Sequence, residues 1–125
     1  MKAYKILAIA ALFAAGQAQA ATDPAVLAAG QKAFNACAGC HSVTKGAPDG
    51  FGPNLNGVYG KAAGTNSPTY HYSAAMKAYG ATWNATTLDA FLTKPQAAVP
   101  GTKMPFGGIS DPATRAALIA YLKAN

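Results

Sequence analysis

Apolar residues recur at helical spacing in a stretch that begins with two typical helix-start residues. Asp23 provides an N-cap, and Pro24 suits the first helical position. The apolar residues that follow share one helical face: Val26, Leu27, Gly30, Ala33 and Phe34. This pattern predicts a helix from Pro24 to about Ala36.

The clearest helical pattern lies in the last fifteen residues. Asp111 provides the N-cap, Pro112 the first helical position, and Lys123 a positive charge in the last turn. The apolar face of this helix consists of Leu118, Ile119, Tyr121 and Leu122. A helix is therefore predicted at each end of the folded domain.

Two shorter helices are predicted between these. One covers residues 73–79 and ends at Gly80, and the other covers about 84–93 and stops because Pro95 cannot continue it. The buried face of the second consists of Leu88, Phe91 and Leu92. The segment 46–54 is too rich in Gly and Pro for an element, and no alternating run indicates a sheet. These patterns predict an all-α fold, a single small domain of short helices and long loops.

Residues 1–20 have the composition of a secretory signal peptide. Two lysines form a positive n-region, residues 6–15 form an apolar h-region, and Ala18-Gln19-Ala20 is an A-x-A cleavage site. The apolar run is too short to span a bilayer, so no membrane anchor is expected. We expect cleavage after Ala20, a mature domain at residues 21–125 and a periplasmic protein.

The chain has ten Lys and Arg residues against four Asp residues, no Glu, and a net charge of +6. The lysines are scattered singly and form no basic stripe, which argues against nucleic-acid binding. The positive excess favours acidic partner surfaces, because opposite charge steers the encounter of two proteins.

Cys37-Ala38-Gly39-Cys40-His41 has the C-x-x-C-H pattern by which c-type haem is attached. The two thiols can form thioethers with the vinyl groups of a porphyrin, and the adjacent His41 can bind the iron. A thioredoxin-like redox pair, half of a zinc site and a disulfide between the cysteines are the alternatives. The redox pair needs a preceding strand, which the pattern lacks, and the zinc site needs further ligands, of which the mature chain offers only His71. The motif favours one covalently attached haem c.

An iron bound by His41 needs either a sixth ligand or an open site. Met76 and Met104 are the methionines beyond the predicted signal peptide. Met104 lies in a Pro-flanked loop that can place its sulfur over a ring, whereas Met76 lies on a short helix, where methionine usually fills a core. Met104 is the predicted ligand, and His71, a Lys side chain or an open site are the alternatives.

Taken in order along the chain, these motifs resemble those of class I cytochrome c, in its mitochondrial and bacterial c2-like branch. The resemblance covers essentially the whole mature chain. It rests on Gly30 and Phe34, on Leu118 and Tyr121, on the C-x-x-C-H motif, on Gly52-Pro53-Asn54-Leu55 and on Pro100-Gly101-Thr102-Lys103-Met104. It implies short helices and loops wrapped around one covalently bound haem.

The resemblance also implies roles for single residues. The implied axial ligands of the haem iron are His41 and Met104. The other implied haem contacts are Cys37 and Cys40 as thioethers, Pro53, whose carbonyl would hold the proximal imidazole, and Tyr72, Trp83 and Thr102 at the propionates.

Some positions depart from the family pattern. Lys61 stands where the mitochondrial branch usually has Arg near the propionates, and a Lys ammonium is a point charge and not a planar fork. Phe91 stands where a Tyr often hydrogen-bonds the methionine sulfur. The ring of lysines at the haem edge is thinned, with Lys45 and Lys103 the clearest that remain.

The resemblance implies a soluble, monomeric one-electron carrier and not an enzyme. Redox proteins would dock transiently at an exposed haem edge near Cys37, Lys45 and Lys103. Such partners could be a bc1-type complex, a terminal oxidase of a respiratory chain, a photosynthetic reaction centre or a periplasmic dehydrogenase. One alternative is a small haem enzyme or ligand-binding haem protein with a labile distal ligand, although the chain has no Glu and a single Arg for such chemistry. Another is a subunit of a larger oxidoreductase.

Overall fold

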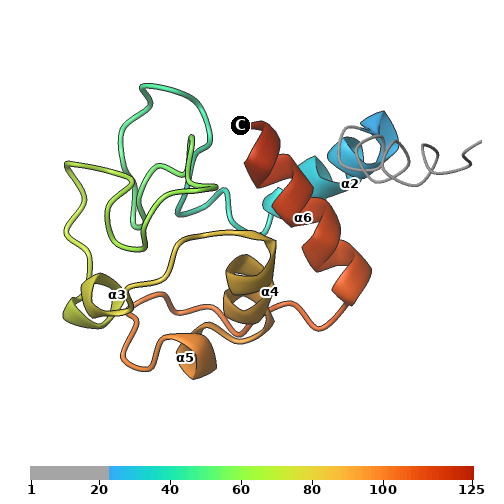
Figure 1. Cartoon of the computed structure of the whole chain (residues 1–125). Coiled ribbons are helices and arrows are strands. Elements are labelled where there is room, and N and C mark those ends of the chain that lie inside the picture. Colours follow the sequence, from blue (N-terminus) through green and yellow to red (C-terminus); the bar gives the residue numbers. More distant parts are fainter. Residues whose placement is uncertain (1–22) are drawn as a thin grey trace, which may run out of the picture.

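A computed structural model describes residues 23–125 of the chain (Figure 1). Its helices are α2 (Pro24–Phe34), α3 (Ala74–Ala78), α4 (Ala85–Thr93), α5 (Pro95–Ala98) and α6 (Pro112–Ala124). Within this part of the chain, extended pairing is limited to an isolated bridge between Ala62 and Thr82. The predicted all-α fold is confirmed. The expected signal peptide at residues 1–20 lies outside the described residues.

Helix α2 begins where the sequence predicts, because the Asp23 carboxylate accepts a hydrogen bond from the Ala25 N–H at 2.8 Å. It ends at Phe34, two residues earlier than predicted. The chain then tightens into turns, in which the Cys37 N–H donates to the Phe34 carbonyl at 2.8 Å. The C-x-x-C-H motif begins within these turns, directly after the helix.

Helices α2 and α6 pack across each other, as Figure 1 shows, and Gly30 of α2 lies against Ala117 and Tyr121 of α6. A β-carbon on Gly30 would lie 2.1 Å from the carbonyl oxygen of Ala117 and 2.6 Å from Cβ of Tyr121. Only glycine therefore allows the two backbones to approach so closely. The rings of Phe34 and Tyr121 pack beside this crossing, with centroids 5.6 Å apart.

Helix α4 has a complete capping box, in which Asn84 accepts from the Thr87 N–H and the Thr87 hydroxyl accepts from the Asn84 N–H. Its predicted buried face is confirmed. The predicted stop before Pro95 is confirmed, since α4 ends at Thr93, but the sequence did not predict α5, which begins at Pro95. Lys94 between them is extended, with φ −160° and ψ 96°, and this single residue allows Pro95 to occupy a first helical position.

The long connection from α2 to α3 contains no helix and folds as loops (Figure 1). One hydrophobic core joins these loops to the helices through Phe34, Val58, Ala63, Trp83, Leu88, Phe91, Leu92, Val99, Leu118, Ile119 and Leu122. Trp83 links the aromatic residues, since its ring lies 5.1 Å from that of Phe91 and 5.7 Å from that of Tyr79. None of the helices in residues 23–125 is long and apolar enough to cross a membrane.

Candidate functional site

The C-x-x-C-H motif forms one turn of backbone. The N–H groups of Cys40 and His41 both donate to the carbonyl of Cys37, at 3.1 and 2.9 Å. Cys37 is half-buried and packs against the core, whereas Cys40 is exposed, and both are free thiols. Cys37 thus borders the core, and His41 follows on the same turn.

The protonation of Cys37 argues against a redox-active pair. Burial, together with the neighbouring Cys40, raises the pKa of the Cys37 thiol. Redox-active C-x-x-C motifs work through the opposite shift, a lowered pKa that creates a thiolate. The turn therefore fits thioether formation better than disulfide exchange.

The imidazole of His41 is held in one tautomer. Its Nδ1 lies 2.7 Å from the carbonyl oxygen of Pro53, so the Nδ1–H donates and Nε2 is left as the unprotonated nitrogen. Burial lowers the pKa of His41 and outweighs the opposing effect of the bond to Pro53. A neutral imidazole with a free Nε2 is the form that binds a metal ion.

The loop that holds His41 depends on a close approach at Gly52. A β-carbon on Gly52 would lie 2.3 to 2.8 Å from three atoms of the His41 ring. The Gly52 N–H also donates to the Cys40 carbonyl at 2.9 Å, which ties the loop to the C-x-x-C-H turn. Pro53 is thereby brought under the imidazole, as the family resemblance predicts.

The candidate sixth ligands differ in their surroundings. Met104 and Met76 are both half-buried and both pack against the hydrophobic core, whereas the side chain of His71 is exposed. Burial alone therefore leaves two thioethers as candidates and disfavours His71.

Hydrogen bonds hold the loop that carries Met104 to neighbouring segments of the chain. The Thr102 hydroxyl accepts weakly from the Met104 N–H at 3.4 Å, and Gln96 donates to the Thr102 carbonyl at 2.7 Å. The ammonium of Lys103 donates to the His71 carbonyl and lies 4.7 Å from the centroid of the Tyr70 ring. These contacts hold the Met104 loop against the segment at 70–72.

Each of the three residues predicted to contact the propionates has a hydrogen-bond donor without an acceptor among residues 23–125. The Tyr72 hydroxyl accepts from the Ser67 N–H at 2.9 Å, but its own proton has no acceptor among residues 23–125. The same holds for the hydroxyl proton of Thr102 and the indole N–H of Trp83, although these residues are only 7% and 6% exposed. No fully enclosed side-chain nitrogen or oxygen in the described part of the chain lacks a partner, so the indole N–H of Trp83, which has none there, reaches an opening. Donors of this kind can hydrogen-bond carboxylates such as the propionates of a haem.

The residues present therefore fit a haem. They comprise two free thiols on one turn, a neutral imidazole with its Nε2 available, half-buried thioethers and donors for the propionates. Lys61, by contrast, is exposed. Its backbone carbonyl accepts a hydrogen bond from the backbone N–H of Trp83 at 2.9 Å.

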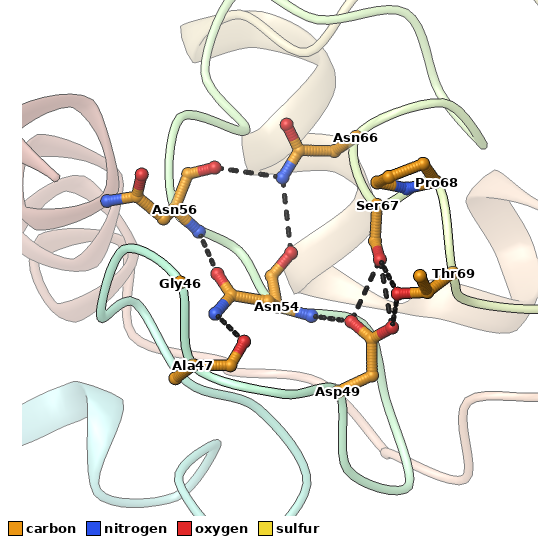
Figure 2. A pocket seen from close by; sticks show the side chains of 9 residues that line it. All are labelled: Gly46, Ala47, Asp49, Asn54, Asn56, Asn66, Ser67, Pro68 and Thr69. Atoms are coloured by element: carbon orange, nitrogen blue, oxygen red, sulfur yellow. Dashed lines mark hydrogen bonds between the residues drawn. The ribbon is translucent and has the colours of Figure 1, made fainter.

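Two residues beside this site were not identified from the sequence. Phe51 is 89% exposed, next to the loop that holds His41. Asp49 lines a polar hollow between the loops at 46–56 and 66–69 (Figure 2). The turn sequence Pro48-Asp49-Gly50 suggested a loop, but it carries no signal for the distant partners of Asp49.

Comparisons with known proteins find one family model and several similar proteins. The family model for cytochrome c matches residues 27–125. Cytochrome c2 of Rhodomicrobium vannielii is 46% identical over 123 residues, which are 98% of this chain and 95% of that protein. Cytochrome c of Sesamum indicum is 48% identical over 101 residues, 80% of this chain and 90% of that one. Among solved structures, cytochrome cH from Methylobacterium extorquens has a TM-score of 0.74 and 46% identity, covering 79% of this chain and 98% of that chain.

Proposed function

The chain belongs to the cytochrome c family, and on this premise we propose that it is a periplasmic electron shuttle whose haem iron is bound by His41 and Met104. Members of this family are electron carriers and not enzymes, and they carry one covalently attached haem c. The observation that carries the His41 assignment is the 2.7 Å bond between its Nδ1 and the Pro53 carbonyl. It leaves Nε2 free on the same turn as the two thiols.

In this proposal Cys37 and Cys40 hold the haem covalently, and His41 binds its iron from the proximal side. The bound haem supplies the iron that cycles between the ferrous and ferric states. The protein keeps the imidazole neutral and oriented through the Pro53 carbonyl, so the ligand has little to rearrange when the electron moves.

Met104 is the distal ligand in this proposal. A thioether fills the sixth position, raises the potential and favours electron transfer over ligand binding. The hydrogen bonds of Thr102 and Lys103 support this choice, because they restrain the loop next to Met104. Tyr72, Trp83 and Thr102 would direct their unused donors to the propionates.

The docking face would lie where the haem attachment turn reaches the surface. Cys40 is exposed there, and the Cys40 carbonyl is bonded to the Gly52 N–H beside the exposed Phe51. This face would combine the exposed apolar ring of Phe51 with the positive charges of Lys45 and Lys103. Such a face would suit a redox partner that has an acidic face. Such electron-transfer contacts are small, below about 1,200 Å² in total, and short-lived.

The proposed location follows from the expected signal peptide. Residues 1–20 would direct export, and residues 21–125 would form the cytochrome domain in the periplasm. Recovery of the haem-loaded protein from the periplasmic fraction, with Ala21 as its first residue, is the result expected. A cytoplasmic protein that retains Met1 would contradict this part of the proposal.

The ligand assignment is tested by comparing Met104→Ala with Met76→Ala. The ferric wild-type protein should show a weak near-infrared charge-transfer band from the sulfur–iron bond. Met104→Ala should abolish this band, and Met76→Ala should keep it, since both changes remove a half-buried methionine. Loss of the band in Met76→Ala alone would overturn the assignment of Met104.

A further inference from the structure

The Asp49 carboxylate joins two loops through hydrogen bonds from three residues (Figure 2). It accepts from the Asn54 N–H at 2.7 Å and from the Thr69 hydroxyl at 2.6 Å. The Ser67 hydroxyl lies 2.9 Å from each of its oxygens. These bonds keep the pKa of Asp49 below its usual range, so the carboxylate is charged at neutral pH.

One of these bonds reaches the peptide group that holds His41. The N–H of Asn54 and the carbonyl of Pro53 belong to the same planar peptide unit. Asp49 accepts from the N–H end of this unit at 2.7 Å, and the carbonyl end accepts from the His41 Nδ1–H, also at 2.7 Å. A single peptide therefore connects a charged carboxylate to the imidazole.

Such a connection has an electronic consequence. Hydrogen bonds in series polarise one another, and a charged acceptor does so more strongly than a neutral one. A carboxylate on the N–H side moves electron density toward the Pro53 oxygen, which becomes a better acceptor for the Nδ1–H. A better acceptor at Nδ1 makes the imidazole a more basic ligand.

We propose that Asp49 is a positioning residue for the proximal ligand, which holds and polarises the Pro53–Asn54 peptide and thereby sets the donor strength of His41. This inference rests on the proposed function, because it concerns His41 as the ligand of a haem iron. A more basic imidazole stabilises ferric over ferrous iron, so Asp49 lowers the reduction potential.

The experiment uses the haem-loaded protein and compares Asp49→Asn, Asp49→Ser and Thr69→Val with the wild type. Thr69→Val is the matched control, because it removes a donor to the same carboxylate but keeps its charge and its bond to Asn54. Two quantities are measured: the proton chemical shift of the His41 Nδ1–H in the ferrous protein, and the reduction potential. Asp49→Ser provides a second loss of charge in case Asp49→Asn does not fold.

The Asp49 variants should move the Nδ1–H resonance upfield, since its hydrogen bond weakens, and should raise the reduction potential. Thr69→Val should leave both close to wild type. A raised potential with an unmoved resonance would overturn the proposal, because Asp49 would then act only as a distant charge. An equal upfield shift in Thr69→Val would also overturn it, because general loosening of the loops would explain the result.

The resonances of His41 in the wild-type protein distinguish a failure of this proposal from a failure of the proposed function. If His41 binds the iron, oxidation should move its ring resonances to strongly paramagnetic positions. Absence of that shift in the wild type would overturn the ligand assignment itself. The normal shift in the wild type, with Asp49 variants that leave the Nδ1–H unchanged, would overturn the role of Asp49 alone.

Discussion

Gly52 lies directly against the imidazole of His41. A β-carbon at this position would be 2.3 Å from Cε1, 2.7 Å from Nδ1 and 2.8 Å from Nε2 of the ring. Real side chains do not approach so closely, so the absence of a side chain at Gly52 is what allows the imidazole to meet the Pro53 carbonyl.

Gly52→Ala should therefore displace the His41 ring. We expect a loss of roughly 1–3 kcal/mol in the free energy of unfolding, as for overpacked cores, and a lower yield of haem-loaded protein. Gly39→Ala, within the C-x-x-C-H motif, is the control, because a β-carbon there meets nothing within 4 Å. Urea unfolding and the haem spectrum measure both effects, and equal behaviour of the two variants would contradict the packing argument.

Arg115 joins α6 to α4 and to the end of the loop that carries Met104. Its Nε donates to Asp89 at 2.7 Å, and its Nη1 donates to the carbonyls of Ile109 and Ser110 at 2.9 and 3.0 Å. Arg115→Met should lower the free energy of unfolding by roughly 1.5–3 kcal/mol, because these acceptors lose a charged donor.

Asp89→Asn is the matched variant for this prediction. The Asp89 side chain is 48% exposed, against 11% for Arg115, so the ion pair itself should contribute at most about 1 kcal/mol. Denaturant unfolding of both variants shows which one loses more of the free energy of unfolding. A larger loss in Asp89→Asn than in Arg115→Met would show that the ion pair outweighs the bonds to the two carbonyls.

Asp111 should make the stability of the domain depend on acid pH. Its carboxylate caps α6 by accepting from the Thr114 hydroxyl and N–H, which hold the pKa of Asp111 below its usual range. A group with a lowered folded-state pKa stabilises the protein above its unfolded value and loses this effect as pH falls through the folded value.

Asp111→Ala should accordingly be less stable than wild type at neutral pH, with a gap that narrows as the pH falls from the ordinary carboxyl pKa through the lowered pKa of Asp111. Asp111→Asn keeps a good N-cap residue and should lie between the two at neutral pH. Urea midpoints measured across the acid range check this. A gap that stays constant with pH would mean that the charge of Asp111 contributes nothing.

Phe51 should contribute to partner binding more than to folding, since 89% of it is exposed. Burying an aromatic side chain in an interface contributes about 1.5–3 kcal/mol, so Phe51→Ser should weaken association with an acidic redox partner by about tenfold or more. The rate of electron transfer to a purified terminal oxidase reports this association, and the rate with ferricyanide should stay unchanged.

Charge at the same face can be tested with Lys45→Gln against Lys32→Gln. Lys45 follows the C-x-x-C-H turn, whereas Lys32 is exposed on α2. Lys45→Gln should slow the oxidase reaction most at low salt, and Lys32→Gln should have little effect. Equal effects of the two would indicate general charge attraction without a defined docking face.

The helix starts were predicted well because their signals are local. Asp23, Asn84 and Asp111 each accept from an N–H group two or three residues away, so neighbouring residues suffice to specify the cap. Helix α5 was missed because a proline that ends one helix can also begin the next, and the apolar pattern does not distinguish these two roles of Pro95.

The sequence by itself determined the haem attachment motif, since both thiols and the proximal imidazole lie within five residues. It also predicted Met104 as the distal ligand, with His71, a Lys side chain or an open site as the alternatives. The tertiary structure decided which groups hold these residues: Asp49 meets Ser67 and Thr69 across 18 and 20 positions, and Lys103 meets the His71 carbonyl across 32. The physical reason is that folding alone brings such distant partners together, and a backbone carbonyl or N–H is the same at every position and gives no signal in the sequence.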